Sequence, residues 1–426
     1  MQCRFGAPGG EVTHDLTPKQ MFDVETIRRE FPLLDREVYG RKLVYLDSGA
    51  TAQKPEAVIR KVDELHRMLN ANIHRGVHYL SEQATELYEE ARQTVARFIG
   101  AAEKEEVIFT AGATASINLV AYAWSERFLE AGDNILISEL EHHSNIVPWQ
   151  LAAARKGAEI RVLPFDEEGR LKVELLPELL DERTKLVAVT QASNTLGTRP
   201  DLKPIIEAAH AVGAVVLVDG CQGVVHGGVD VEALDCDFYA FSGHKLYGPT
   251  GIGVLYGKRA LLEAMPPFMG GGDMVDRVSF EKTTYAPVPL KFEAGTANYI
   301  GAIGLAEAIR FLEGLDMEEV ERYEQELLCY ATQELQKIEG LRIYGTTANK
   351  CAILSFNVEG VHGYDLGMIL DKLGIAIRTG QHCAEPVMKH FGVQGMCRAS
   401  LALYNTREEI DALVRGVERA VRMLRG

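Results

Sequence analysis

Lys245 is the side chain of this sequence whose surroundings most clearly favour chemistry. It lies in the stretch "DFYAFSGHKLYGPTGIGVLYG", residues 237–257, among aromatic, apolar and glycine residues. Such surroundings disfavour the charged ammonium form of a lysine, and the free amine is a nucleophile toward carbonyl groups. We therefore predict that Lys245 forms a Schiff base with a carbonyl compound.

Further polar residues come at or just after the ends of predicted strands, where open α/β sheets bind their ligands. The helix start after "FTAG" could hold a phosphate through its free N–H groups. Taken singly, each residue also has an ordinary structural explanation, such as a turn and cap at Ala113, a surface position for His142 or a loop cap at Asp219. The whole set is Ala113, Thr114, His142, Asn194, Asp219, Ser242, His244 and Lys245.

Cys383 is a second candidate nucleophile. The sequence holds seven cysteines, and of these Cys383 lies in a short loop just past a predicted strand, in "GIAIRTGQHCAEP". A small buried side chain is the alternative for any cysteine. The polar neighbours Gln381, His382 and Glu385 instead favour a mobile, partly exposed thiolate.

Strands and helices must alternate to bring these residues together. From about residue 45 to 300, short apolar runs alternate with amphipathic stretches, which predicts an α/β fold with a mostly parallel sheet covered on both faces. Later, long 3.6-period stretches precede the strands "AILSFNV" and "GIAIRTG", which predicts a smaller α+β domain. We divide the chain into an N-terminal segment that joins the small domain (1–38), a large domain (39–300) and a small C-terminal domain that carries the Cys383 loop (301–426).

Composition and charge exclude several classes of protein. The chain has 426 residues with 46% hydrophobic and 25% charged side chains, enough for two globular domains. A formal net charge of −16 argues against nucleic-acid and anionic-membrane partners. No apolar run is long enough to span a membrane and residues 1–20 hold no apolar signal core, so we expect a cytoplasmic protein. The scattered cysteines predict neither a disulfide framework nor a metal site.

Five motifs together resemble one enzyme family. They are "EHHSNIVPWQ", "VVLVDGCQG", "SGHKLYGPTGIGVLYG", "FEAGT" and "RTGQHCAEP". In order and spacing they are similar to the group II cysteine desulfurases, the branch related to selenocysteine lyases, within the class V aminotransferases of fold type I. The similarity runs from about residue 21 to the C-terminus. It implies a large domain with a seven-stranded sheet and the cofactor pyridoxal 5′-phosphate.

The resemblance implies a role for each cofactor-binding residue. Lys245 would bind the cofactor aldehyde, Asp219 would pair with the pyridine nitrogen, and His142 would stack on the ring. Gln222 would hydrogen-bond the phenolic oxygen. The phosphate would be held by Ala113, Thr114, Ser242 and His244, and by Thr296 of a neighbouring subunit in a homodimer. Family members commonly carry a threonine where this chain has Ala113, so one hydroxyl contact is missing, although the backbone N–H of Ala113 can still donate.

On the substrate side, the resemblance assigns L-cysteine to a second group of residues. Arg398 would clamp the substrate carboxylate in a bidentate pair. Asn194 would support the ring and the carboxylate, and Arg378 would anchor a loop near the nucleophile. His74 and Arg75 would belong to an active-site loop.

The resemblance also implies the fate of the sulfur. Cys383 would take the sulfur as a persulfide and pass it to an acceptor protein of the SufE, CsdE or SufU kind, for iron–sulfur cluster or thiocofactor assembly. Because the Cys383 loop is short, transfer would require an acceptor docked at the site. Alternatives are a selenocysteine lyase, an aminotransferase, for which Cys383 would have no use, and a non-catalytic dimeric scaffold.

Overall fold

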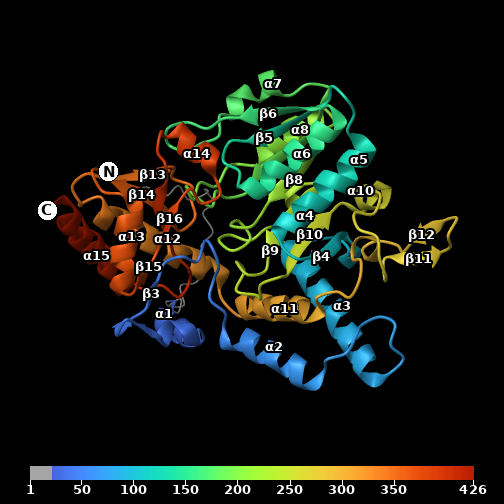
Figure 1. Ribbon diagram of the computed structural model, residues 1–426, viewed down its shortest axis with the longest axis horizontal. Coiled ribbons are helices and arrows are strands. Elements are labelled where there is room, and N and C mark those ends of the chain that lie inside the picture. Colours follow the sequence, from blue (N-terminus) through green and yellow to red (C-terminus); the bar gives the residue numbers. More distant parts are fainter. Residues whose placement is uncertain (1–21) are drawn as a thin grey trace, which may run out of the picture.

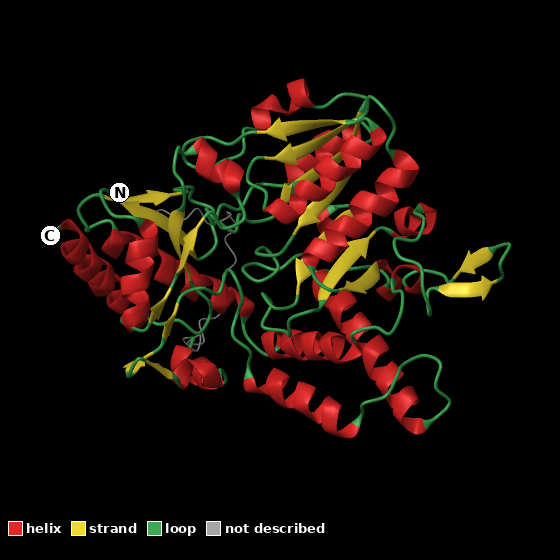
Figure 2. Ribbon diagram, viewed as in Figure 1, coloured by secondary structure: helices red, strands yellow, loops and turns green. Residues whose placement is uncertain are grey.

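A seven-stranded sheet forms the centre of the larger part of the molecule (Figures 1 and 2). The structure, a computed structural model, describes residues 22–426, so most of the predicted N-terminal segment lies outside the described residues. Strands β9, β8, β7, β5 and β6 run parallel, and β10 runs antiparallel to its neighbours β4 and β9. The predicted mostly parallel α/β fold is confirmed. In sheet order the strands are β4 (Val107–Thr110), β10 (Gly253–Gly257), β9 (Phe238–Ser242), β8 (Val215–Asp219), β7 (Thr184–Thr190), β5 (Asn134–Ser138) and β6 (Glu159–Leu163).

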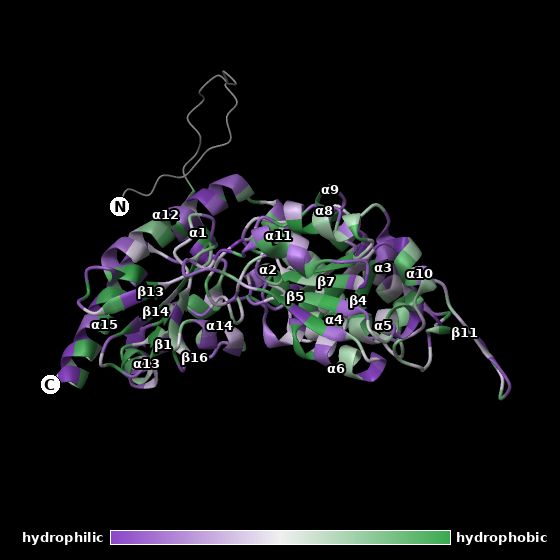
Figure 3. Cartoon of the chain, turned by 90° about the horizontal axis from the view of Figure 1, so that it is seen from above, coloured by the Kyte–Doolittle hydropathy of each residue, from purple (hydrophilic) through white to green (hydrophobic). Residues whose placement is uncertain are grey.

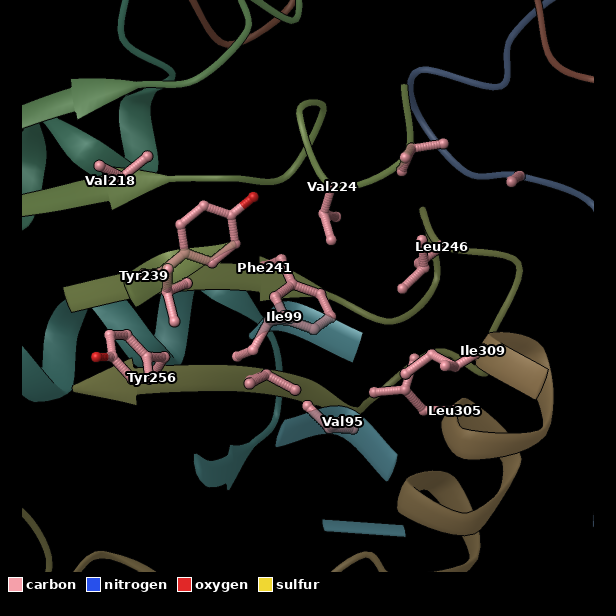
Figure 4. Close-up of a cluster of buried hydrophobic side chains, with 14 of the residues drawn as sticks. Val95, Ile99, Val218, Val224, Tyr239, Phe241, Leu246, Tyr256, Leu305 and Ile309 are labelled. Carbon is pink, nitrogen blue, oxygen red and sulfur yellow. The ribbon is translucent and has the colours of Figure 1, made fainter. Parts of the chain in front are cut away.

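The strands are apolar on both faces because each face packs against a helical layer. Successive side chains of a strand point to opposite faces. In β8, Val216 and Val218 belong to one buried cluster and Leu217 to another. Figure 4 shows Val218 of the first cluster, together with Leu305 and Ile309, which come from a helix that packs on the same face of the sheet.

Helices cover both faces of this sheet (Figure 3). One layer shares the cluster of Val218, and the other shares the cluster of Leu217. The helix that begins at Ala113 continues through a π-helical turn, Val120–Trp124, so the end of β4 feeds directly into a long helical segment. The first layer consists of α2 (Glu56–Met68), α3 (Tyr79–Ile99), α8 (Lys203–Ala211) and α11 (Tyr299–Glu313), and the second of α4 (Ala113–Leu119), α5 (Ser125–Phe128) and α6 (Val147–Lys156).

A second, antiparallel sheet forms the smaller unit, at the left of Figure 1. Its apolar core also takes in Val44 and Leu46, because β3 (Val44–Tyr45) pairs with β15 (Ile375–Ala376). In sheet order its strands are β13 (Leu341–Tyr344), β14 (Ile353–Val358), β17 (Met396–Ser400) and β16 (Arg378–Gly380), and its helices are α12 (Met317–Leu335), α13 (Gly363–Lys372) and α15 (Arg407–Arg425). Helix α14 (Glu385–His390) follows β16 along the chain, but its buried Val387 and Met388 belong to the core of the large sheet.

The chain passes between the two cores after α11. The predicted boundary at residue 300 falls at the start of this helix, whose buried residues, such as Leu305, pack in the core of the large sheet. Buried residues of α12, from Leu327 onward, pack in the core of the small sheet. We therefore propose a domain crossing between α11 and α12.

The remaining elements lie at the periphery. A hairpin of β11 and β12 projects from the large unit (Figure 1). Within residues 22–426, no helix has both the length and the apolar character needed to cross a membrane. The peripheral elements are α1 (Val24–Arg29), β1 (Glu37–Val38), β2 (Arg41–Lys42), α7 (Leu176–Leu179), α9 (Val231–Leu234), α10 (Arg259–Ala264), β11 (Val275–Val278) and β12 (Thr283–Tyr285).

Candidate active site

A cavity of about 320 Å³ lies between the carboxyl ends of the large-sheet strands and the small sheet. It brings together most of the residues that the sequence predicted, from both parts of the chain. His74, Arg75, Gln222 and Thr296 are not among its lining residues. The lining is Gly49, Ala50, Ala113, Thr114, His142, Ser144, Asn194, Asp219, Cys221, Ser242, His244, Lys245, Arg378, Thr379, His382, Cys383 and Arg398.

Lys245 and Asp219 form the floor of this cavity, just beyond β9 and at the end of β8. The Asp219 carboxylate is buried, and its Oδ1 accepts a hydrogen bond from the N–H of Cys221 at 3.0 Å. Within residues 22–426, no hydrogen bond or ion pair involves the Lys245 amine or the second oxygen of Asp219. Both groups are thus open to a ligand in the cavity.

His142 and His244 contribute neutral imidazoles to the cavity wall. Burial, and next the charge of Lys245, lower the pKa of His142 to about 4. Burial and the Lys245 charge likewise lower the pKa of His244 to about 4. The Nδ1 of His142 accepts from the backbone N–H of Ser144 at 3.1 Å, which leaves the proton on Nε2. An uncharged ring with a fixed tautomer suits stacking on a flat ligand.

The start of α4 forms another side of the cavity. Gly112 has φ 151°, and a Cβ on the facing Gly253 would lie 2.4 Å from Gly112 Cα, so the two backbones require glycine at this approach. The N–H of Ala113, which the sequence analysis expected to donate to a phosphate, donates to Ser242 Oγ at 2.9 Å. Thr114 is exposed, so its hydroxyl can turn toward a ligand.

Arg398 comes from the small sheet and is 1% exposed. It donates to the carbonyl of Asn194 at 2.8 Å and to Asp47 Oδ1 at 3.1 Å, while its buried Nε has no partner in the described part of the chain. Arg378 also donates to Asp47, at 3.0 Å. Asp47 therefore holds both guanidinium groups at the same edge of the cavity.

Cys383 lies in the loop between β16 and α14 and is the exposed cysteine among the described ones. By contrast, Cys221 lines the same cavity but is buried, and burial raises the pKa of its thiol to about 12. Of the two thiols in the cavity, Cys383 is thus the accessible one. The sequence analysis expected a partly exposed Cys383, and the structure places it at an exposed position.

The four predicted residues outside the lining fall into two groups. Gln222 is buried and donates to the carbonyl of Gly49 at 2.7 Å, so it supports the cavity wall from behind. His74, Arg75 and Thr296 lie elsewhere: Arg75 is exposed and pairs with Asp273 at 3.0 Å, and Thr296 is exposed.

Sequence reasoning did not find Asp47, Gly49, Cys221 and His382. Cys221 lies inside the quoted motif "VVLVDGCQG" and His382 lies beside Cys383, so both could have been selected by position. Asp47 and Gly49 follow β3 in "YLDSGAT", a strand end of the kind that located the other residues. The position after a strand end therefore points to Asp47 and Gly49 as well.

Comparisons with known proteins agree on one family. Residues 44–413 match the model of the family "Aminotransferase class-V". The cysteine desulfurase of Pectobacterium carotovorum subsp. carotovorum (strain PC1) is 54% identical over 404 residues, which cover 95% of this chain and 99% of that protein. The crystal structure of the cysteine desulfurase CsdA from Escherichia coli has a TM-score of 0.88 at 43% identity, and the match covers 95% of this chain and 100% of that one.

A more distant structure shares the fold alone. It is a C-DES mutant with glycine covalently linked to its PLP cofactor, with a TM-score of 0.79 at 22% identity, covering 92% of this chain and 98% of that one. At this low identity the agreement shows a common fold and nothing more.

Proposed function

The chain belongs to the aminotransferase class-V family, among its cysteine desulfurases, and from this premise we propose that it converts L-cysteine to L-alanine with a persulfide on Cys383. One observation carries the proposal: an exposed thiol, Cys383, lines the same cavity as the unpaired amine of Lys245. An amine nucleophile and a thiol nucleophile together suit a reaction that first activates an amino acid and then removes its sulfur.

The residues of the cavity fit pyridoxal 5′-phosphate, the cofactor of this family. An unpaired amine, a buried carboxylate with a free oxygen and a helix start fit its aldehyde, pyridine nitrogen and phosphate. When bound, this cofactor withdraws electrons from the substrate Cα. Lys245, Asp219 and His142 would hold the ring, with Gln222 near the phenolic oxygen, and Ala113, Thr114, Ser242 and His244 would hold the phosphate. We propose that Thr296 of a second copy completes the phosphate site in a homodimer, and that His74 and Arg75 belong to an active-site loop on the substrate side.

Arg398 and Asn194 bind and orient the substrate in this proposal. The Nε of Arg398 has no partner in the described part of the chain, so the guanidinium would offer a donor to the carboxylate of a bound substrate. Arg378 and Arg398 share Asp47, which keeps the two guanidinium groups from separating. Lys245 would remove the Cα proton and can return it to the product.

Cys383 then accepts the sulfur. Its thiolate attacks the sulfur of L-cysteine, a sulfur–sulfur bond forms, and the carbon–sulfur bond breaks with its electron pair left on Cβ. That carbon takes a proton and becomes the methyl group of L-alanine, so L-cysteine plus the Cys383 thiol gives L-alanine plus the Cys383 persulfide. The exposure of Cys383 supports transfer of this sulfur to an acceptor protein, for iron–sulfur cluster or thiocofactor assembly.

The test is to incubate the purified protein with L-cysteine and a thiol reductant, and to measure alanine and sulfide. Equal yields are expected, because each turnover releases one of each. A keto acid in place of alanine would contradict the proposal and would identify an aminotransferase instead.

A further inference from the structure

The backbone of the Cys383 loop adopts a conformation that side chains resist. His382 and Cys383 have φ of 55° and 54°, two consecutive non-glycine residues in the left-handed region. Residues with a Cβ avoid this region, and the surrounding structure must hold them in it. The contacts of this loop therefore decide where the Cys383 thiol lies.

Hydrogen bonds from residues on both sides of the cavity hold His382. Its carbonyl accepts from the side-chain amide of Asn194 at 2.8 Å, and its Nε2 donates to the carbonyl of Met396 at 2.9 Å. Asn194 follows β7 of the large sheet, whereas Met396 begins β17 of the small sheet. These bonds fix the residue before the nucleophile.

His143 holds the residues at and after the nucleophile. Its backbone N–H donates to the carbonyl of Cys383 at 2.7 Å, and its side-chain Nε2 accepts from the N–H of Glu385 at 3.2 Å. Glu385 is the first residue of α14, so this bond also satisfies a free N–H at a helix start. One histidine of the large unit thus contacts both ends of the segment 383–385.

A rigid base supports His143. The carboxyl group of Glu141 is fully buried and accepts from Asn145 at 2.6 Å and from the N–H of Thr190, at the end of β7, at 2.7 Å. The segment 141–145 is therefore fastened to the sheet on both sides of His143. Positions fixed in this way transmit their geometry to what they contact.

We propose that His143 is a positioning residue for the nucleophile, and that the acceptor at its Nε2 fixes Cys383 against the large unit. The contact itself is observed, and its purpose, to position a nucleophile, rests on the proposed function. His143 is absent from the lining of the active-site cavity and instead lines a neighbouring groove together with Gln381 and Glu385. It therefore acts through the Cys383 loop and does not touch the substrate.

Two variants separate the hydrogen bond from the bulk of the side chain. His143→Gln places a carbonyl oxygen near the position of Nε2 and keeps the acceptor, whereas His143→Leu keeps the volume and removes it. The backbone bond from residue 143 to Cys383 remains in both. His66→Leu, at an exposed histidine on α2, is the matched control.

The expected result is a split between the two variants. His143→Leu should lower kcat for alanine formation about 10-fold, because a misplaced reacting atom slows the chemical step, and leave KM within about twofold. His143→Gln should stay within about threefold of the unchanged protein, since the acceptor is retained. His66→Leu should change neither value.

Alkylation of Cys383 by iodoacetamide gives a readout that does not depend on turnover. The freed loop of His143→Leu should react at least about threefold faster than the loop of the unchanged protein or of His143→Gln, since local opening exposes the thiol. Mass spectrometry of the Cys383 peptide measures this rate, with the Cys329 peptide as internal reference. Should His143→Leu fail to fold, His143→Gln against His143→Ala gives the same comparison.

Either of two outcomes would overturn the inference. Equal alkylation and equal kcat in His143→Leu and the unchanged protein would show that the contact does not position the nucleophile. Equal impairment in His143→Leu and His143→Gln would show that some property other than the acceptor matters. If the unchanged protein forms no alanine, the proposed function fails, while the alkylation comparison still tests the contact.

Discussion

The two walls of the active-site cavity differ in how they hold their nucleophiles. Lys245 follows a fully buried strand of the large sheet, with neutral histidines beside it. Cys383 is exposed, in a left-handed loop that side-chain contacts hold. The side of the cavity that carries Lys245 and Asp219, here called the lysine wall, suits a cofactor that stays bound through every turnover. The side that carries Cys383, Arg378 and Arg398, here called the cysteine wall, suits a sulfur atom that must leave.

Replacing Lys245 with alanine removes the amine of the lysine wall and should have the largest effect on activity. Alanine formation should fall by roughly four orders of magnitude or more, since within residues 22–426 no other lysine lines the cavity and could serve the cofactor and the Cα proton. In the unchanged protein, borohydride should fix the cofactor on the Lys245 peptide. Lys54 is the informative control, because burial lowers its pKa to about 8, yet its amine donates to the carbonyls of Ala52 and His244. An adduct on Lys54 would contradict the assignment.

Cys383→Ala removes the thiol of the cysteine wall and leaves the lysine wall unchanged. Alanine formation from L-cysteine should fall at least about 10³-fold, because the sulfur then has no acceptor, while the absorbance of the bound cofactor stays unchanged. L-selenocysteine should still react, since its selenol is ionised near neutral pH and its carbon–selenium bond is weaker. Cys221→Ala, at the buried thiol of the same cavity, should retain activity. Rapid alanine release by Cys383→Ala would mean that the sulfur leaves by direct elimination.

Asp219→Ala tests whether the lysine wall works through its charge. The variant should fold and bind the cofactor but turn over roughly 10²–10³-fold more slowly, because a buried carboxylate no longer stabilises charge on the ring. Steady-state kinetics and the cofactor spectrum together measure this effect. Turnover near that of the unchanged protein would show that the ring lies in another orientation.

Asp47→Asn tests how the two guanidinium groups of the cysteine wall are held. Asparagine keeps the shape of the side chain but removes the charge that Arg378 and Arg398 share. We expect KM for L-cysteine to rise about 10-fold with a smaller change in kcat, because substrate binding needs a correctly placed guanidinium. A change confined to kcat would argue that Asp47 instead serves the chemical step.

Acidification should have a smaller effect, on stability. The pKa values of His142, His244 and His382 are lowered from 6.5 to about 4, 4 and 3, mainly by burial. Below pH 6.5 the unfolded chain therefore binds protons that the folded chain does not, and the free energy of unfolding should fall as the pH drops toward 4. Urea denaturation of the protein and of His142→Gln, at pH 7 and pH 5, measures it. A fall with pH as steep in His142→Gln as in the unchanged protein would exclude a contribution from His142.

The sequence by itself determined the large sheet and the lysine wall. Buried strands and amphipathic helices follow from local periodicity, and the carboxyl ends of parallel strands meet at one edge. Asp219, Ser242 and Lys245 could therefore be placed together from their positions after β8 and β9. The exposure of Cys383 followed in the same way from its polar neighbours.

Tertiary structure alone decided how the second wall is held. Asp47 reaches Arg398 within the small unit, where Asp47 bridges to Ser400 of β17, and His143 of the large unit reaches Glu385 across 242 residues of chain. Such contacts join segments that lie far apart in the sequence, and no local pattern of residue types encodes them. The chemistry of each nucleophile was readable from its neighbours in sequence, whereas the distance and angle between the two nucleophiles follow from the packing of the two units.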